Sequence, residues 1–455
     1  MHTKESYANP ILEGSITKQI LLFFFPIVFG TFFQQLYNTV DMIIVGRFVG
    51  TDALASVGGS AAQIINLVIG FFTGLSAGSG VIIAQAYGAG DKKRLSDNIH
   101  TAYAYAIVGG ILFTIVGIFS AAPSLTAMHN PTELMTDSAL YLRIYYGGIL
   151  FVLIFNIGSA ILRALGNSRR PLYALIVCCF LNIFLDIVFV VLFHLGIAGA
   201  ALATVLSQLV SAVLVTVFLM RTPQAPLVLS RIRCHRRCLS AQLYVGIPDG
   251  FQTVMYSFAN LIIQAAINGY GTSAVAAWAA EAKIEAFFWM VSGAYCVAAT
   301  TFTGQNYGAG KYERIQKGTR ICLLLHQGTC VMISLVFFIF ARPLIMIFTS
   351  DPEVIRLGIQ VLHLITPFYA VFSFVEILSS VLRGMNDVII PMLLTLFGVC
   401  ILRIIWTLGV VPLHPGIPML CANYPITWIT TSLLFIGYYL YRKRHGLYAS
   451  ASSNT

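Results

Sequence analysis

The sequence predicts an all-α polytopic membrane protein, with twelve transmembrane helices in two lobes of six, and three observations carry this prediction. Of the 455 residues, 58% are hydrophobic and only 10% are charged, whereas roughly a quarter of the residues of an ordinary soluble domain are charged. Apolar runs of membrane-spanning length recur along the whole chain. A sequence motif is also repeated halfway along the chain. A soluble protein is thereby excluded.

Apolar stretches, and the polar or Gly/Pro-containing breaks between them, define the predicted spans. Their approximate ranges are 17–45, 53–82, 95–121, 134–162, 171–193, 197–219, 241–269, 273–302, 315–340, 354–382, 391–411 and 417–440. Because the number of spans is even, both ends of the chain lie on the same side of the membrane.

The distribution of Lys and Arg predicts which side that is. The chain carries 27 Lys and Arg against 17 Asp and Glu. The terminal segments and the loops on their side hold 21 of these basic residues, and the opposite side holds four. The positive-inside rule therefore places both ends in the cytoplasm. The basic residues form short clusters between spans, which indicates topology signals rather than nucleic-acid binding. The short tails suit a bacterial inner membrane.

An internal repeat with a displacement of 220 residues divides the chain. The stretch Gln85-Ala86-Tyr87-Gly88-Ala89-Gly90 recurs as Gln305-Asn306-Tyr307-Gly308-Ala309-Gly310, and Leu162-Arg163 before Pro171 recurs as Leu382-Arg383 before Pro391. The six-residue motif follows no predicted strand, so we interpret it as a tight turn that ends a helix, with Gly88 or Gly90 at positive φ, rather than as a phosphate-binding loop.

Six spans in each half preserve the direction of the chain, so the repeat predicts two lobes related by a pseudo-twofold axis along the membrane normal, with a substrate site between them. The basic, proline-containing stretch between the sixth and seventh spans is either a simple tether or a linker that lets the lobes move as bodies, and we favour the linker. The predicted domains are the N-terminal lobe 1–220, the linker 221–240, the C-terminal lobe 241–441 and a cytoplasmic tail 442–455.

Two acidic spans, Tyr37-Asn38-Thr39-Val40-Asp41 and Asn182-Ile183-Phe184-Leu185-Asp186, accompany the repeated motif and the Leu-Arg-x-x-Gly-Asn stretch at 162–167. In combination these features resemble the multidrug and toxic compound extrusion (MATE) family over roughly residues 14–440. The resemblance is greatest to the DinF-like branch, because no acid follows Pro248 in the middle of the seventh span. It implies a V-shaped pair of six-helix lobes that exports amphipathic, often cationic compounds in exchange for inward Na⁺ or H⁺.

The two acids of the first half are the leading candidates for function, because a carboxylate within a span is costly and usually faces a bundle interior or an aqueous cavity. Gln34, Asn38 and Asp41 follow one another at i, i+4 and i+7, and Asn182 and Asp186 at i and i+4, so each acid continues a polar stripe. Facing stripes would give oxygen ligands for a hard cation or a protonatable carboxylate. Hydrogen-bonded packing is the alternative.

The resemblance assigns roles to these and neighbouring residues. It implies cation coupling by Asp41, Asn182, Asp186 and Thr204, with Asn182 and Asp186 as the metal ligands if Na⁺ is bound. We further expect the substrate cavity to involve Gln34, Asn38, Tyr141 and Asn156. No cofactor is expected besides H⁺ or Na⁺ as the coupling ion.

The second half carries a separate set of charged residues: Glu281, Lys283, Glu285 and Glu376. Glu281 and Glu285 share a helix face, whereas Lys283 projects away from it and needs a partner such as Glu376 from another helix. A structural ion pair and a part in transport both remain open for this set. Pro26 in the first span is a hinge candidate, with a static bend as the alternative.

We weigh export against two other functions. A lipid-linked glycan flippase of the same superfamily would line its cavity with several basic residues, but only Lys283 and Arg403 lie well within spans. A membrane-embedded enzyme such as an acyltransferase needs a clustered His/Asp or metal site, but the nine His residues are scattered. The sequence therefore favours a non-enzymatic secondary active exporter of small amphipathic organic compounds, which sits in the lipid bilayer, binds no nucleic acid and acts as a monomer.

Overall fold

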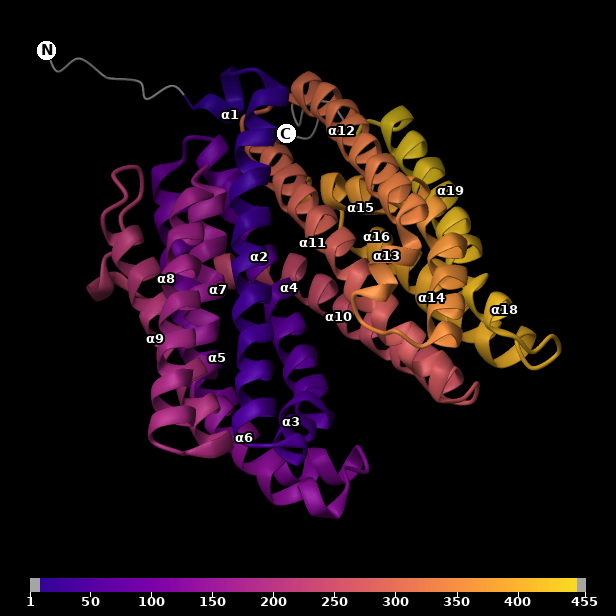
Figure 1. The fold of residues 1–455 in the computed structure, drawn as a ribbon. Coiled ribbons are helices and arrows are strands. Elements are labelled where there is room, and N and C mark those ends of the chain that lie inside the picture. The colour runs from indigo at the N-terminus through magenta and orange to yellow at the C-terminus, as the bar shows by residue number, and fades with distance from the viewer. Residues whose placement is uncertain (1–8, 448–455) are drawn as a thin grey trace, which may run out of the picture. The chain divides into compact units, whose positions relative to one another are not determined.

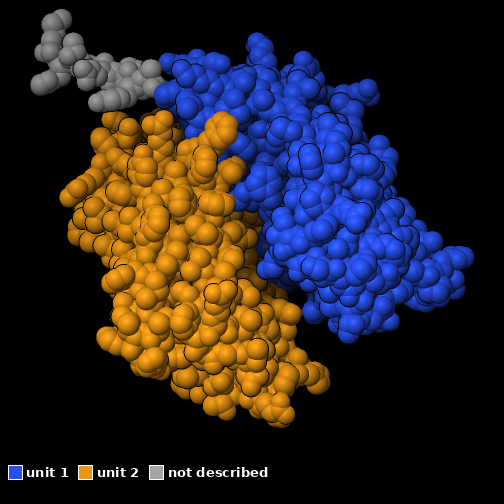
Figure 2. All heavy atoms as spheres, viewed as in Figure 1, with its two compact units in different colours: residues 1–24, 251–455 blue, residues 25–250 orange. Residues whose placement is uncertain are grey.

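The structure is a computed structural model that describes residues 9–447, so the last part of the predicted tail and the first residues of the chain lie outside the described range. All regular elements among the described residues are helices, and these residues contain no strand, which confirms the all-α fold class (Figure 1). They group into two compact units, drawn in different colours in Figure 2: unit 1 combines residues 1–24 and 251–455, and unit 2 is residues 25–250.

Unit 2 contains most of helix α2, helices α3 to α9 and the first turns of α10. The bounds of these helices are α2 (Ile16–Phe48), α3 (Thr51–Gly58), α4 (Ser60–Gly88), α5 (Lys92–Ala127), α6 (Met135–Gly147), α7 (Ile149–Ala164), α8 (Arg169–Asp186), α9 (Gly196–Met220) and α10 (Arg236–Asn268). Its core is formed by α4, α5, α6, α7 and α9, and α8 packs along α9.

Unit 1 contains α1, the first turns of α2, most of α10 and the remaining helices. Their bounds are α1 (Pro10–Glu13), α11 (Thr272–Gly308), α12 (Tyr312–Ile339), α13 (Ala341–Met346), α14 (Pro352–Ile365), α15 (Tyr369–Gly384), α16 (Ile389–Thr395), α17 (Leu402–Ile405), α18 (Ile417–Cys421) and α19 (Asn423–Arg444). An aromatic cluster fills its centre, where Phe288 stacks on Tyr369 at 3.8 Å and Trp428 packs against Phe372.

Each of the twelve predicted spans coincides with a helical segment. Among the described residues, ten helices are long and apolar enough to cross a membrane, and the pair Thr132–Gly147 and Ile149–Ala164, bent by 48°, makes eleven if it is one span. Helix α10, at the place of the seventh predicted span, is long enough but not apolar enough to be counted among these helices. Polar side chains such as Gln252 and Asn260 reduce its hydropathy.

The repeated motif forms the same turn in both units. Gly90 has φ 70° and Gly310 has φ 68°, a left-handed conformation that glycine adopts without the steric penalty of a Cβ atom. The turns end α4 and α11, and the N–H groups of Ala89 and Ala309 donate to the carbonyls of Gln85 and Gln305 at 2.9 and 3.0 Å. The predicted helix-ending turn is confirmed, with Gly90 rather than Gly88 at positive φ.

The N-terminal segment packs on the motif of the second half, within unit 1. Arg314 donates from Nε to the Ile11 carbonyl at 3.1 Å and also bonds the Gly14 carbonyl, and Lys311 donates to the Leu12 carbonyl at 3.1 Å. The Asn9 amide donates to Gln305 Oε1 at 2.9 Å. Helix α1 is thereby fixed to the turn between α11 and α12.

The connector between the halves packs on α5, the helix that follows the motif of the first half, within unit 2. The N–H of Val228 donates to Nε2 of His100 at 3.1 Å, and the N–H of His235 donates to the Thr101 hydroxyl at 3.2 Å. Both partners lie on α5. The connector is therefore held along unit 2 by specific hydrogen bonds.

The first turns of α10 are also built into unit 2 by a close helix crossing. A Cβ atom on Gly78 of α4 would lie 2.4 Å from the backbone nitrogen of Gly246, and one on Gly74 would lie 2.2 Å from that of Gly250. Only residues without a side chain allow the two backbones to approach so closely. The unit boundaries follow Phe24 and Gly250, each two residues from a proline inside a helix, Pro26 in α2 and Pro248 in α10.

Candidate functional site

Helices α8 and α9 form one wall of the candidate cation site in unit 2. Asn182 and Asp186 lie one turn apart on α8 and have no solvent exposure, and Thr204 on α9 is buried opposite them. The Asn182 amide donates to the Thr204 hydroxyl at 3.5 Å, and this hydroxyl donates to the Ala200 carbonyl one turn earlier at 3.2 Å. Three of the predicted residues thus lie together.

Helix α2 brings Asp41 to the same unit, where only 7% of the residue is exposed. Tyr37 lies one turn before Asp41, and its hydroxyl accepts a hydrogen bond from Nε2 of Gln208 at 3.3 Å. Gln208 in turn lies one turn after Thr204 on α9. This hydrogen bond sets the register between α2 and α9 beside the acids.

Five buried oxygen atoms of this region have no hydrogen-bond partner among the described residues. They are Oδ1 of Asp41, Oδ1 of Asn182, both carboxylate oxygens of Asp186, and Oε1 of Gln208. Buried polar atoms nearly always have a partner, because an unpaired one costs free energy. A group of acceptors without donors has the chemistry of a site for a hard cation or for protons.

Tyr141 on α6 completes the surroundings of the two carboxylates. It is buried, and it lies close enough to both Asp41 and Asp186 for electrostatic interaction. The two carboxylates are also close enough to interact with each other. Like charges at such a distance repel each other, which favours a bound cation or proton between them.

The other predicted cavity residues lie at the edge of this group. Asn156 on α7 and Gln34 on α2 are half-buried, and Asn38 is exposed. The buried face of α2 runs through Tyr37, Asp41 and the following turn, so Asn38 projects to the side of it. The structure therefore brings together the four coupling candidates and Tyr141, but not the whole polar stripe of α2.

Asp186 stands at a break in helix geometry. Helix α8 ends at this residue and continues as a π-helical segment, Ile187–Leu192, in which the N–H of Phe193 donates to the Val188 carbonyl at 2.9 Å. A π-helical turn widens the helix and is frequent at functional sites. The repeat contains a counterpart, the π-helical segment Trp406–Val410 in unit 1.

Within unit 1, the predicted charged residues of the second half do not form one group: Glu281 and Glu285 are neighbours on α11, whereas Lys283 and Glu376 lie apart from each other. Glu281 on α11 is buried, Glu285 one turn later is half-buried, and Lys283 is exposed and forms no ion pair with a described residue. Glu376 on α15 accepts a hydrogen bond from the Cys296 thiol at 2.7 Å. The structure thus places a thiol, and not Lys283, beside Glu376.

Arg403 is a buried charge that the site prediction did not include. Only 3% of this residue is exposed, and its Nη1 donates to Oδ1 of Asn260 at 3.0 Å. Its guanidinium carbon lies 4.3 Å from the ring centre of Tyr424, and its charge acts on Glu285. Arg403 is therefore the positively charged neighbour of the acidic pair on α11.

No group of three or more His, Cys, Asp or Glu residues in the described part of the chain is arranged to hold a metal ion. A bound Na⁺ would depend on two carboxylates with amide and hydroxyl oxygens, which are the ligands that hard monovalent and divalent cations take. The residues around Asp186 meet this requirement, since their free acceptors are all oxygen atoms.

Sequence reasoning missed Tyr37 and Gln208. A signal for them exists, because Tyr37 is four residues before Asp41 and Gln208 four residues after Thr204, so each continues the face of a predicted site residue. The pairing of their side chains depends on the register between α2 and α9, which the spacing within one helix does not contain.

The sequence profile of the MatE family matches residues 26–188 and 248–408. YpnP of Bacillus subtilis, described as a probable multidrug resistance protein, is 28% identical over 87% of this chain and 88% of the relative. YoeA of the same organism, with the same description, is 25% identical over 94% of each chain. A multidrug resistance MATE family transporter solved in an outward-facing conformation has a TM-score of 0.88 at 23% identity, over 96% of this chain and 98% of that chain, which shows the shared fold.

The family match covers most of the chain and both halves of the repeat. The assignment to the DinF-like branch stays a prediction. With its helical fold, its apolar spans and this match, the chain belongs to the MatE family and is a membrane transporter, not an enzyme.

Proposed function

We propose that this transporter exports small amphipathic, often cationic organic compounds in exchange for inward H⁺ or Na⁺. The observation that carries the proposal is the cluster of five unpaired buried oxygens around Asp186 within the helices of unit 2. The names of the relatives YpnP, YoeA and NorM of Thermotoga maritima, all probable multidrug resistance proteins, support multidrug efflux as the direction of transport.

In this proposal Asp186, Asn182, Thr204 and Asp41 bind the coupling ion. Na⁺ would take the free oxygens of Asp186 and Asn182 together with the Thr204 hydroxyl, and H⁺ would bind to one of the carboxylates. Either ion neutralises a charge that would otherwise be buried without compensation. Filling this site is therefore coupled to any rearrangement of α2, α8 and α9 that exposes or closes it.

The substrate takes part through charge and contact area. A cationic compound is attracted by unoccupied carboxylates and repelled once these are neutralised, so occupancy by the ion and by the drug exclude each other. Tyr141 and Asn156, together with Gln34 and Asn38 at the more accessible side of α2, are the proposed contacts with the compound. Their aromatic and amide groups accept varied ligands without demanding one geometry.

Alternating access requires a place where the long helices change shape. Helix α2 continues through Pro26, where the missing N–H removes one helical hydrogen bond. The boundary between the two compact units follows Phe24, which is adjacent to this weak point. We propose that α2 bends at Pro26 during transport, that both chain ends face the cytoplasm and that the monomer is the working form.

Reconstitution in liposomes tests the proposal. Purified protein is placed in vesicles, a Na⁺ gradient and a pH gradient are imposed separately, and transport of a fluorescent organic cation is followed. We expect one of the gradients to drive transport at several times the rate in protein-free vesicles and in vesicles without a gradient. Transport that is insensitive to both gradients would contradict antiport, and absence of dye transport would contradict the substrate class.

A further inference from the structure

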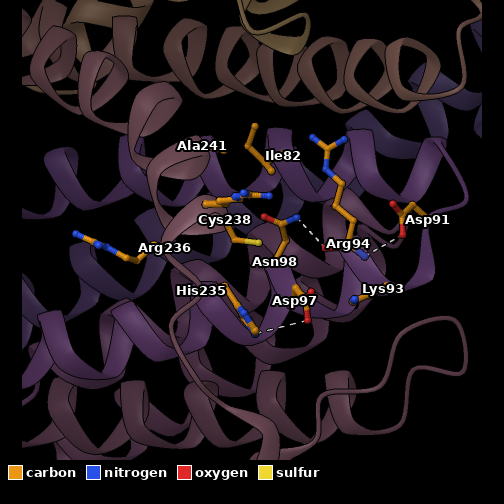
Figure 3. A pocket seen from close by; sticks show the side chains of 11 residues that line it. Ile82, Asp91, Lys93, Arg94, Asp97, Asn98, His235, Arg236, Cys238 and Ala241 are labelled. Carbon is orange, nitrogen blue, oxygen red and sulfur yellow. Dashed lines mark hydrogen bonds and ion pairs between the residues drawn. The ribbon is translucent and has the colours of Figure 1, made fainter.

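A basic cavity of about 520 Å³ lies in unit 2, where the first turn of α5 meets the connector and the start of α10 (Figure 3). Lys93 and Arg94 from α5 and Arg236 and Arg237 from α10 line it. A second cavity of about 500 Å³ shares Lys93 and adds Lys92, Arg231 and Arg233. The two cavities form one surface, which we name the connector pocket.

The connector pocket has a large excess of positive charge. Seven Lys and Arg residues line it against two acids, Asp91 and Asp97. The Asp91 side chain caps α5 by accepting from the N–H of Arg94 at 2.9 Å, and Asp97 faces Nε2 of His235 at 3.5 Å. None of the seven cations forms an ion pair within the described residues. The pocket therefore has the charge of an anion-binding site.

The internal repeat shows what the equivalent arginine does in the other unit. Arg94 corresponds to Arg314, and the guanidinium of Arg314 donates to the carbonyl oxygens of Ile11 and Gly14. The connector provides no such oxygen to Arg94, whose hydrogen bonds within the described residues involve only its backbone. Figure 3 shows its guanidinium extending away from Asp91 into the cavity. Arg94 thus keeps the donor groups that its counterpart uses to bind oxygen.

We propose that the connector pocket binds the phosphate group of an anionic lipid headgroup. Arginine matches the oxygens of a phosphate with two parallel hydrogen bonds, and basic pockets at the cytoplasmic ends of membrane helices are typical binding places for such headgroups. The inference is independent of which ion or compound the protein transports.

The position of the pocket favours a lipid over a soluble phosphate compound. Arg94 precedes the predicted span 95–121, and Arg237 precedes the span 241–269, so the charged groups lie at the depth of the headgroups. Ile82 and Ala241 add apolar side chains to the lining of the cavity. A ligand with a phosphate at one end and an apolar chain at the other fits this arrangement of charge and apolar surface.

Lipid titration of the purified full-length protein tests the proposal. Short-chain phosphatidylglycerol, phosphatidylcholine of the same chain length and inorganic phosphate are titrated separately in a neutral detergent, and bound ligand is counted by native mass spectrometry. We expect phosphatidylglycerol to bind and phosphatidylcholine to bind at least about fivefold more weakly. Binding of phosphatidylglycerol is also expected to weaken as salt concentration rises.

Charge-neutralising variants locate the binding. Arg94→Gln and Arg237→Gln are each expected to weaken phosphatidylglycerol binding about fivefold, and the double variant more strongly. Arg221→Gln is the matched control, because Arg221 is an exposed connector residue that does not line the pocket. A single symmetric gel-filtration peak and an unchanged melting temperature show that the variants are folded, and Arg94→Lys should restore part of the affinity.

Each outcome decides the proposal. Equal binding by the unmutated protein, Arg94→Gln and Arg237→Gln would overturn the pocket as the site. Inorganic phosphate that binds as tightly as phosphatidylglycerol, with the same sensitivity to Arg94→Gln, would overturn the lipid assignment and make the ligand a soluble phosphate compound. Equal affinity for the anionic and the zwitterionic lipid would overturn recognition by charge.

Discussion

Gln208 on α9 donates a hydrogen bond to the hydroxyl of Tyr37 on α2 at 3.3 Å, and each residue lies one turn from a residue of the candidate cation site. Both side chains are buried, so loss of one partner leaves the other with an unpaired polar group. The pair therefore contributes to the alignment of Asp41 with Thr204.

We expect Tyr37→Phe and Gln208→Leu each to lower the stability of the protein by about 1–3 kcal/mol. The double variant should lose less than the sum of the two, because no buried partner is left unpaired. Thermal unfolding in detergent measures both effects. Tyr173→Phe, at an exposed tyrosine of α8, is the control and should be neutral. Strict additivity would show that the hydrogen bond contributes nothing to stability.

Asp186→Asn removes a negative charge while preserving size and one carbonyl oxygen. We expect gradient-driven export to fall at least about tenfold in this variant, and export to fall also in Asp41→Asn, because each change removes charge from the proposed coupling site. Membrane levels of the protein should stay unchanged. Asp137→Asn, at an exposed residue of α6, is the control. Near-normal export by both site variants would identify the acids as packing groups.

Drug binding should weaken as the pH falls. A protonated Asp186 carries no negative charge, so it no longer attracts an organic cation, and Na⁺ at the same oxygens has the same effect. Coupling of this kind typically changes affinity about 5- to 150-fold. Equilibrium binding of a fluorescent cation in detergent, measured against pH and Na⁺ concentration, checks this expectation, and Asp186→Asn should flatten both dependences. If binding by the unmutated protein does not change with pH or Na⁺ concentration, Asp186 is not the coupling residue. Glu281, Glu285 and Glu376 then become the candidates.

Membrane topology can be tested with a native cysteine. Cys234 in the connector is exposed, while the other free cysteines are buried or half-buried. An impermeant thiol reagent should label Cys234 in inside-out vesicles and leave it unlabelled in intact cells, because the Lys/Arg distribution predicts a cytoplasmic connector. Asp137→Cys in a background without Cys234 should show the opposite pattern. Labelling of Cys234 from outside would show that the topology is the opposite of the predicted one.

The crossing of α4 and α10 predicts a sharp difference between two neighbouring glycines. Gly78→Ala places a Cβ atom 2.4 Å from the Gly246 nitrogen, so the helices must separate, which costs about 1–3 kcal/mol. Gly80→Ala makes only ordinary contacts at 3.7 Å and should be neutral or slightly stabilising. Melting temperatures of both variants in detergent test the crossing, and equal values would contradict it.

The helices and the helix-ending turns could be predicted because they depend on local features of the sequence. Apolar length and its interruptions marked a helical segment at each predicted span, and the repeat identified Gly90 and Gly310 as equivalent turn residues. The site acids could be proposed because a buried carboxylate is costly wherever it lies within a span. The predicted lobe boundaries and residue roles stay predictions.

Contacts between helices could not be predicted in the same way. Asn38 continues the polar stripe of Asp41 in sequence, but the packing of α2 buries the face with Tyr37 and leaves Asn38 exposed. Lys283 was matched with Glu376 by charge, whereas the structure places Cys296 beside that carboxylate. The packing of α1 relies on backbone carbonyls, which every residue has, so the side-chain pattern carries no sign of it.

Each half of the repeat begins with a segment that packs in the unit of the other half: α1 packs in unit 1, and the first turns of α10 pack in unit 2. The repeated sequence is therefore not the folding unit. A fragment that ended in the connector would lack the turns of α10 that pack on the glycines of α4. A fragment that began at α10 would lack the carbonyl oxygens of Ile11 and Gly14, to which Arg314 donates. The first fragment would expose the glycine surface of α4, and the second would leave Arg314 without these acceptors. Each half of the repeat thus depends on a segment of the other half to complete its packing.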